Sequence, residues 1–341
     1  MNKLHYILFF ILLSAFTTRE SNLSYPSSWP KPSYDFSKNP IEKNKVNLGR
    51  VLFYDPILSD NNSISCESCH SPYSAFTHID HALSHGIYDS IGTRNSPALM
   101  NLAWKKSFMW DGAINNLDMQ ALAPITHPLE MGSSIKNVVI KLQASKKYRQ
   151  LYFQAYGDST VTGEKTLKAI SQFLLTLISA NSKYDKVMNG DEQFSTQEKN
   201  GYALFQKNCS SCHREPLFTN DEFANNGLPE NPTLKDKGRM HITLDSTDAY
   251  KFKIPTLRNI EYTFPYMHDG RFKKLSEVMN HYTSGIIDSK TLAPSLKNKI
   301  TLTQNEKVDI ISFLLTLSDK EFVFNSKHTY PKEIISSVAK D

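Results

Sequence analysis

Two short stretches of the same form carry the residues with the clearest chemical use, Cys66-Glu67-Ser68-Cys69-His70 and Cys209-Ser210-Ser211-Cys212-His213. This C-x-x-C-H pattern attaches a c-type haem, because the two thiols add to the haem vinyl groups and the adjoining histidine becomes an iron ligand. The two copies use all four cysteines of the chain. The sequence therefore predicts two covalent c-type haems, anchored by Cys66, Cys69, Cys209 and Cys212 and ligated by His70 and His213.

Three other uses of paired cysteines compete with haem attachment. Two C-x-x-C pairs could bind zinc or work as redox dithiols, but neither use explains a histidine directly after both pairs. Disulfides within each pair are compatible with an exported protein, although they would leave both histidines without a role. Haem attachment is the interpretation that uses every residue of the pattern.

Length and charge limit the classes of protein that the chain can belong to. Its 341 residues are enough for two domains of ordinary size. The two haem patterns stand 143 positions apart, so we expect one haem in each domain. The formal charge of +5 is mild, and no basic cluster is interleaved with aromatic residues in the way that would follow a nucleic-acid backbone. Nucleic acid is therefore not expected as a partner.

Residues 1–20 are predicted to be a secretory signal peptide. Met1-Asn2-Lys3 supplies its basic start, and an apolar run from Tyr6 to Phe16 follows. That run is too short to span a bilayer comfortably, and a buried N-terminal helix is the alternative interpretation. Covalent haem attachment of this kind takes place outside the bacterial cytoplasmic membrane, so the pattern and the signal agree. The sequence therefore predicts an exported bacterial protein of the periplasm.

The elements that must position the haem patterns are predicted to be helices. Residues 21–39 are rich in Ser and Pro and are expected to form an extended arm. Helical periodicity then recurs, and each half closes with the same pentad, Phe-Leu-Leu-Thr-Leu, at 173–177 and at 313–317. Ser195 and Glu198 form a capping box at the start of the helix before the second haem pattern.

Order and spacing repeat along the chain. Gly49-Arg50-Val51-Leu52-Phe53 and Gly201-Tyr202-Ala203-Leu204-Phe205 precede the two haem patterns, and residues 97–112 match residues 255–270 without a gap at an offset of 158. We therefore predict an all-α protein of two cytochrome c-like haem domains related by internal duplication, with long loops around the haems. The domains are predicted at residues 40–188 and 189–330, and a tail follows at 331–341.

Further stretches mark a family. They are Cys-x-x-Cys-His-Ser-Pro-x-x-Ala-Phe-Thr at 66–77, Arg94-Asn95-Ser96-Pro97, Trp110-Asp111-Gly112, Glu130-Met131-Gly132 and Pro265-Tyr266-Met267-His268-Asp269-Gly270. Together they resemble the bacterial dihaem cytochrome c peroxidase and MauG superfamily over essentially the whole chain after the arm. The resemblance implies a cytochrome-c peroxidase, an oxidoreductase whose N-terminal haem binds hydrogen peroxide. The C-terminal haem would take electrons from a small donor such as a cytochrome c or a cupredoxin.

The resemblance also implies residues for the open face of the first haem. His85, within Ser84-His85-Gly86, stands at the place of the distal histidine that can occupy the sixth iron position, and His78 and His81 compete with it as neighbours. Histidine suits such a role because it is both a metal ligand and a titrating group.

Three more residues correspond to catalytic positions of the family. Gln120 and Glu130 would be the pocket amide and acid, because a carboxyl of raised pKa can move the proton that O–O cleavage requires. Trp110 corresponds to the tryptophan between the haems, which is proposed to help carry electrons. A water-facing glutamate and an ordinary buried aromatic are the alternative interpretations of Glu130 and Trp110.

A calcium ion between the domains is a further implication of the resemblance. Its protein ligands would be the side chain of Asn95 and the carbonyl oxygens of Thr263 and Pro265, and oxygen atoms are the ligands that calcium prefers. The sequence leaves a homodimer open as well.

The second haem departs from the peroxidase pattern. The peroxidases carry a ligand methionine fourteen residues beyond the histidine that corresponds to His268, and that position is Tyr282 here, as in MauG-type proteins. A phenolate ligand stabilises ferric iron and lowers the reduction potential. Met267, Met279 and His281 are the alternative ligands.

These residues leave three hypotheses for function. His85 favours a peroxidase that is supplied with electrons by a small redox protein. Tyr282 favours a MauG-like oxidase of protein tyrosine or tryptophan residues. A dihaem electron carrier without catalysis is the third hypothesis, and it would have no need of Gln120 and Glu130 in a pocket.

Overall fold

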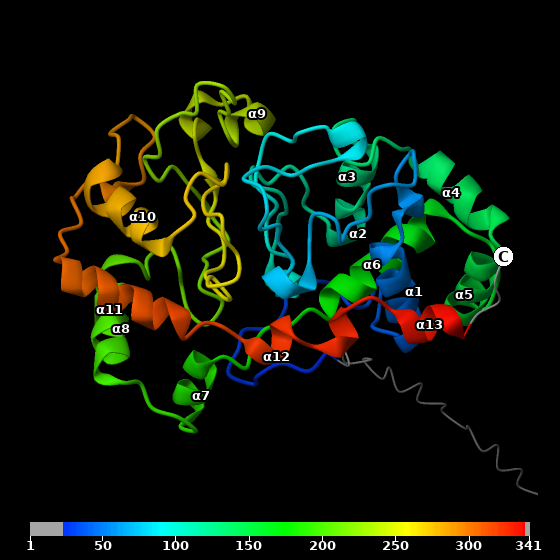
Figure 1. Ribbon diagram of the computed structural model, residues 1–341, viewed down its shortest axis with the longest axis horizontal. Helices are drawn as coiled ribbons and strands as arrows, with labels where there is room; N and C mark the ends of the chain where they lie inside the picture. The colour runs from blue at the N-terminus through cyan, green and yellow to red at the C-terminus, as the bar shows by residue number, and fades with distance from the viewer. Residues whose placement is uncertain (1–22, 338–341) are drawn as a thin grey trace, which may run out of the picture.

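The computed structural model describes residues 23–337, and Figure 1 shows two helical halves that lie side by side with loops between them. The predicted signal peptide, residues 1–20, lies outside the described residues, as do the last residues of the predicted tail, 338–341. Within the described range, no helix is both long and apolar enough to cross a membrane.

The first half is built on two helices that cross closely. Its helices are α1 (Lys43–Tyr54), α2 (Leu117–Gln120), α3 (Leu122–Thr126), α4 (Ile135–Ala144), α5 (Lys146–Tyr156) and α6 (Gly163–Leu175). Helices α1 and α6 can touch because Gly49 has no side chain, and a Cβ there would lie 1.8 Å from the carbonyl oxygen of Ala169. Phe53 and Phe173 then pack edge to face, with ring centroids 5.3 Å apart.

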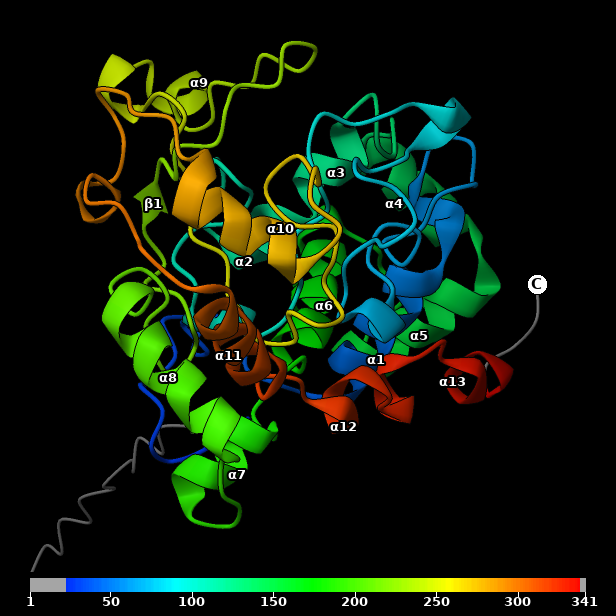
Figure 2. The same ribbon diagram turned by 60° about the vertical axis from the view of Figure 1, so that its left-hand side comes forward.

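The second half repeats this crossing. Its elements are α7 (Lys183–Asn189), α8 (Thr196–Asn208), β1 (Phe223–Ala224), α9 (Met240–Thr243), β2 (Phe252–Lys253), α10 (Leu275–Asn280) and α11 (Gln304–Leu315). Helices α8 and α11 form the matching pair, and a Cβ on Gly201 would lie 1.9 Å from the carbonyl oxygen of Asp309. The view turned by 60° brings α8, α10 and α11 forward (Figure 2).

Two local predictions can be compared with these elements. The capping box at the start of α8 is confirmed: the Glu198 N–H donates to Ser195 Oγ at 3.2 Å, and the Ser195 N–H donates to the Glu198 carboxylate at 2.7 Å. The predicted all-α class is confirmed in that helices predominate, and the described residues add one pair of short strands. Strands β1 and β2 pair antiparallel, with Phe223 opposite Lys253.

Buried apolar side chains form two clusters, one in each half. The first includes Phe53 of α1, Phe173 of α6 and Phe76 of the loop after the first haem pattern. The second includes Phe205 of α8, Phe313 of α11 and Phe218 of the loop after the second haem pattern. Each haem pattern is therefore set between a helix pair and its own apolar core.

The end of the chain returns to the first half, as the red segment of Figure 1 shows. It carries α12 (Lys320–Val323) and α13 (Lys332–Ser336). Phe322 belongs to the first apolar cluster, and Arg50 of α1 pairs with Glu333 of α13 at 2.8 Å. The predicted second domain extends to residue 330, so its last part packs against the other half. Periodicity along a chain shows that a helix has an apolar face but not which core that face joins.

The arm contains turns but neither helix nor strand between residues 23 and 39. It packs through aromatic rings, since Trp29 and Trp104 meet with centroids 5.1 Å apart. The indole N–H of Trp104 donates to the carbonyl oxygen of Pro30 at 2.7 Å. The Arg258 guanidinium lies 4.7 Å from the Trp29 ring, so the arm contacts a residue of each half.

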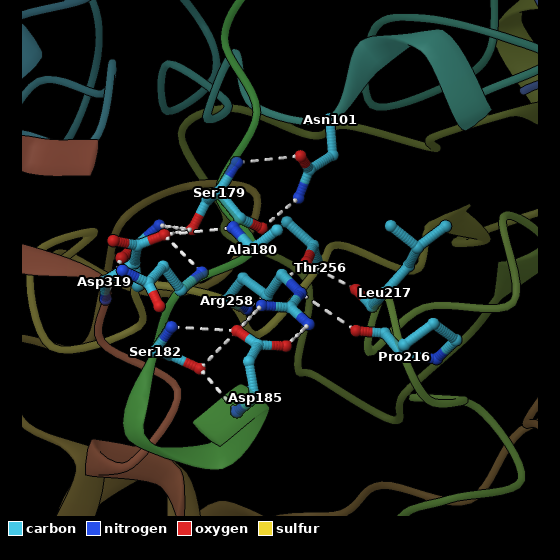
Figure 3. A network of polar contacts seen from close by, with 12 residues as sticks. Asn101, Ser179, Ala180, Ser182, Asp185, Pro216, Leu217, Thr256, Arg258 and Asp319 are labelled. Carbon is cyan, nitrogen blue, oxygen red and sulfur yellow. Dashed lines mark hydrogen bonds and ion pairs between the residues drawn. The ribbon is translucent and has the colours of Figure 1, made fainter. Parts of the chain in front are cut away.

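Figure 3 shows a polar network where the linkers between the halves meet. The Ser179 N–H donates to Asn101 Oδ1 at 3.0 Å, and the Asp319 N–H donates to Asn259 Oδ1 at 2.7 Å. The two bonds are themselves connected, because the Asn259 side-chain amide donates to Ser179 Oγ at 2.9 Å. Asn101 and Asn259 are 158 positions apart, so the two ends of the network have the same form.

The same offset of 158 recurs in backbone geometry. Positive φ angles occur at matched positions, namely Asn101 and Asn259, Met109 and Met267, and Gly112 and Gly270. Isolated antiparallel bridges are matched as well, Phe108 to Ile114 in the first half and Tyr266 to Phe272 in the second. Segments 97–112 and 255–270 therefore share a conformation as well as a sequence pattern.

Candidate haem sites

The first haem pattern forms one tight turn after α1. The Cys69 N–H donates to the carbonyl oxygen of Cys66 at 3.2 Å, and the His70 N–H donates to that of Glu67 at 3.1 Å. Nδ1 of His70 lies 2.9 Å from the carbonyl oxygen of Phe76. This contact fixes the ring and leaves Nε2 as the nitrogen for an iron. Burial lowers the pKa of His70 to about 4, so the imidazole is held in the neutral form that binds metals.

The second haem pattern has the same arrangement at the end of α8. The His213 N–H donates to the carbonyl oxygen of Cys209 at 2.9 Å. Nδ1 of His213 lies 3.2 Å from the carbonyl oxygens of both Phe218 and Pro255. Burial lowers the pKa of His213 to about 4 as well. Both histidines are thus oriented by backbone carbonyls, with Nε2 remaining for the metal.

The cysteines suit thioether formation better than the alternatives. All four are free thiols, so neither pair forms the disulfide considered from the sequence. Burial raises the pKa of Cys66 and of Cys209 to about 12. Such thiols stay protonated without a metal, and the described residues hold no group of three or more His, Cys, Asp or Glu side chains that could bind one. The donor set of each pattern therefore fits a c-type haem.

His85 lies against the first haem anchor. The Cys69 thiol donates to the carbonyl oxygen of His85 at 3.3 Å. The His85 ring belongs to a cluster with the two competing histidines: its centroid lies 4.1 Å from that of His81 and 6.5 Å from that of His78. The structure therefore brings all three candidates to one loop.

Glu130 joins the same place from the other side. A Cβ on Gly86 would lie 2.0 Å from the carbonyl oxygen of Leu129, and the Ile87 N–H donates to the carbonyl oxygen of Glu130 at 2.8 Å. The chain that carries His85 is thus packed directly on the chain that carries Glu130. Gly86 is required there, since any side chain would separate the two segments.

The Glu130 carboxyl is partly withdrawn from solvent, with 30% of the side chain exposed. Burial raises its pKa, and His127, 3.8 Å away, acts in the opposite direction. Burial also raises the pKa of Cys69 to about 11, and the charge of Glu130 adds to that rise. The carboxyl is therefore within electrostatic reach of the first haem anchor.

Gln120 ends α2, and its amide nitrogen lies 3.8 Å from the sulfur of Met109. A similar contact occurs in the second half, where the Asn226 amide lies 3.5 Å from the sulfur of Met267. Asn226 was not identified from the sequence, because a single asparagine in a loop carries no pattern. Each half thus sets a side-chain amide against a methionine of the repeated segment.

Trp110 lies where the halves meet. Its indole N–H donates to the carbonyl oxygen of Asn95 at 2.8 Å. The Asn95 N–H donates across the junction to the carbonyl oxygen of His268 at 2.7 Å. The Asn95 side-chain amide donates to the carbonyl oxygen of Ala82 at 3.0 Å. Asn95 is buried, and its Oδ1 accepts no hydrogen bond from the described residues. The predicted calcium ligand thus sits at the junction with an oxygen to offer.

Tyr282 is the predicted ligand of the second haem. It lies on a single π-helical turn, His281–Gly285, and such turns are frequent at functional sites. Burial raises its pKa to about 12, the Asn226 side chain lowers it, and the charges of Cys209 and Cys212 raise it further. These influences place the phenol beside the second haem anchor.

The alternative ligands have contacts of their own, and Tyr282 shares two of them, since it also interacts with Asn226 and packs against the second apolar cluster. Nε2 of His281 lies 3.0 Å from the carbonyl oxygen of Asn226. Met279 is 7% exposed and belongs to the second apolar cluster. The sulfur of Met267 already meets the Asn226 amide.

Comparisons with known proteins identify relatives of this chain. The model of the di-haem cytochrome c peroxidase family matches residues 43–193. The methylamine utilization protein MauG of Methylophilus methylotrophus is 34% identical over 302 residues, covering 86% of each chain. The cytochrome c551 peroxidase of Nitrosomonas europaea is 32% identical over 284 residues, covering 82% of this chain and 81% of its own.

One solved structure is similar over nearly the whole molecule. It is a MauG-like protein associated with microbial copper homeostasis, with a TM-score of 0.83 and 30% identity. The match covers 91% of this chain and 99% of the other.

Proposed function

The chain belongs to the di-haem cytochrome c peroxidase family, and we propose that it reduces hydrogen peroxide to water at the haem beside His70. Each c-type haem, when bound, supplies an iron that binds peroxide or carries electrons. His70 and His213 would each offer Nε2 to an iron, since Nδ1 of each faces a carbonyl oxygen. The two electrons for each peroxide would come from a small redox protein, a cytochrome c or a cupredoxin.

The observation that carries this proposal is the half-buried carboxyl of Glu130 on the chain segment that packs against His85 and Gly86. Heterolytic cleavage of the O–O bond requires a proton to move from one peroxide oxygen to the other. A carboxyl of raised pKa can accept that proton and return it near neutral pH. Gln120 would orient the peroxide through its amide, and His85 would control access to the iron.

Trp110 would link the two haem sites, because its hydrogen-bond partner Asn95 is itself bonded across the junction. Calcium would bind at Asn95, Thr263 and Pro265, where the buried Asn95 side chain offers Oδ1. We also propose that the halves arose by internal duplication and that the protein works in the periplasm. The matched turns at an offset of 158 support the first statement, and the apolar run near the N-terminus supports the second.

A MauG-like oxidation of tyrosine or tryptophan residues is the second candidate function. The position of Tyr282 beside Cys209 and Cys212 favours it. A phenolate ligand would lower the potential of the second haem and make that haem a poorer acceptor of electrons from a cytochrome c.

The decisive experiment is the substitution Glu130→Gln in the haem-loaded protein. Peroxide is added to the fully oxidised and half-reduced forms in a stopped-flow spectrometer, and reduced cytochrome c is supplied afterwards. Loss of the proton carrier should lower kcat by about 10²–10⁴-fold. Both haem spectra should stay as in the wild type.

Glu67→Gln is the matched control. Burial raises the pKa of Glu67 too, and the charge of Glu67 also acts on Cys69, so the two glutamates have similar electrostatic surroundings. Their positions differ, because Glu67 lies within the haem pattern itself and not on the segment that packs against His85. This variant should keep wild-type turnover. Wild-type turnover in Glu130→Gln would remove Glu130 from the reaction. Peroxide consumption by the oxidised form alone, without use of cytochrome c, would favour the MauG-like candidate.

A further inference from the structure

Trp110 is held by a reciprocal pair of hydrogen bonds between the halves. The Lys253 N–H donates to the carbonyl oxygen of Trp110 at 2.7 Å, and the Asn95 N–H donates to the carbonyl oxygen of His268 at 2.7 Å. Lys253 stands 158 positions after Asn95, and His268 stands 158 positions after Trp110. The two bonds are therefore equivalent, as they would be across a two-fold axis. Figure 1 shows the cyan loops of the first half facing the yellow loops of the second.

Charged side chains, Arg94 and Arg239 among them, reinforce the Trp110 side of this pair. Arg94, the neighbour of Asn95, binds Asp236 of the other half at 2.6 and 3.0 Å through two nitrogens. Its third nitrogen binds Asp111, the neighbour of Trp110, at 2.6 Å. The side chains are 20%, 6% and 10% exposed for Arg94, Asp236 and Asp111, so solvent screens these pairs little.

The matching aspartate of the second half is arranged differently. Asp269 corresponds to Asp111, and its partner is Arg271, two residues further along, with Nε to Oδ2 at 2.9 Å. That ion pair is local and does not reach the first half. The ion pair between Arg94 and Asp236, which crosses the junction, therefore lies on the side of Trp110. The matching position of the second half carries His268 in place of a tryptophan.

Arg94 also limits movement of the residues that face Trp110. Its guanidinium lies 5.7 Å from the Phe252 ring, and Phe252 stacks on His268 with ring centroids 3.7 Å apart at 12°. Phe252 directly precedes Lys253, whose N–H binds Trp110. Arg94 therefore contacts the residue after Trp110, which is Asp111, and the residue before Lys253, which is Phe252.

We propose that Arg94 is a positioning residue for Trp110, and that its ion pair with Asp236 fixes the distance and orientation of the indole between the two haem sites. This inference rests on the proposed role of Trp110 in electron transfer. A planar guanidinium suits the task because two parallel hydrogen bonds to one carboxylate fix direction as well as distance. Without it, the halves would keep their backbone hydrogen bonds and the contacts of Arg239 with the Asp111 carbonyl oxygen and of Lys253 Nζ with Ser107 Oγ. They would lose the paired hydrogen bonds that fix direction.

The test measures electron exchange between the haems without peroxide. The haem-loaded protein receives one electron from a photoexcited reductant, and absorbance follows the redistribution of that electron between the two haems. Arg94→Gln should slow redistribution by about tenfold or more, since a misplacement of about 1 Å can cost a geometry-dependent step about a hundredfold. Asp236→Asn should slow it too, and Arg94→Lys should recover part of the rate because charge is kept while the paired geometry is lost.

Arg271→Gln is the matched control, because it removes an ion pair of the same type from the equivalent place. Its rate should match the wild type, and redox titration should give unchanged midpoint potentials for both haems in every variant. Unchanged rates in Arg94→Gln and Asp236→Asn would overturn the proposal. Equal slowing in Arg271→Gln would also overturn it, since loosening of the junction in general would then explain the effect. A failure of peroxide reduction would leave this result untouched, because no peroxide is used.

Discussion

The ion pair between Asp185 and Arg258 gives the sharpest prediction for stability. Both carboxylate oxygens bind the guanidinium, at 2.7 and 2.8 Å, and the side chains are 7% and 0% exposed. Asp185→Asn would leave the Arg258 charge buried without its counter-charge, and breaking such a pair costs about 3–5 kcal/mol. With an unfolding entropy of about 2.1 cal/mol/K per residue over the 315 described residues, Tm should fall by about 5–8 °C.

Thermal unfolding of the haem-loaded protein, followed by far-UV circular dichroism, measures this shift. Asp158→Asn is the control, because Asp158 pairs with Lys165 at 2.7 Å on the surface and should give no resolvable change. A fall in Tm of less than about 2 °C for Asp185→Asn would contradict this cost, since it would mean that the buried guanidinium finds other acceptors, such as the carbonyl oxygen of Pro216.

The same pair predicts a dependence on pH. Burial raises the pKa of Asp185, but the hydrogen bonds and charge of Arg258, together with Ser182, outweigh burial and hold this pKa below its usual range. A carboxyl with a lowered folded pKa stabilises the fold above its unfolded pKa of about 3.9, and the stabilisation is lost as pH falls further. The Tm difference between wild type and Asp185→Asn should therefore be constant near neutral pH and shrink below about pH 4. A difference that widened at low pH would contradict the assignment.

Two further predictions concern the helix crossing and the second haem. Gly201→Ala should prevent α8 from meeting α11, because a Cβ would lie 1.9 Å from the carbonyl oxygen of Asp309, and the variant should lose the absorbance of the second haem. In Gly157→Ala, the control, the new Cβ would meet no atom within 4 Å. That variant should lose only about 1–2 kcal/mol of folding stability, for its positive φ, and keep both haems. Tyr282→Met should raise the midpoint potential of the second haem, since a thioether favours ferrous iron more than a phenolate does, whereas Met279→Leu should change nothing; an unchanged potential in Tyr282→Met would exclude Tyr282 as a ligand.

Local chemistry was predictable from the sequence because it depends on spacing. The haem anchors need two thiols and an imidazole within one turn, and the capping box at Ser195 needs an acid three residues on, so both appear in the residue order itself. The helix crossings at Gly49 and Gly201 left a trace as well, in glycines four residues before a core phenylalanine.

Long-range pairing was not predictable in the same way. Arg94 meets Asp236, which is 142 positions away, and no pattern around either residue distinguishes the pair from exposed charges. The packing of α12 and α13 on the first half could not be predicted for the same reason, because periodicity shows that a helix has an apolar face but not which core that face joins. Asn226 beside Met267 is a contact between two loops, and neither loop carries a periodic signal.

The reciprocal bonds at the junction explain how two similar halves can take different tasks. The bonds from Asn95 to His268 and from Lys253 to Trp110 use only backbone atoms, so they hold the halves together whatever side chains stand at these four positions. Selection can then change the side chains without separating the halves. Here one side received an indole with a crossing ion pair to Asp236, and the other a histidine stacked on a phenylalanine. If the proposed function holds, a symmetric framework with asymmetric side chains would give electrons one preferred route, as a division of labour between two haems requires.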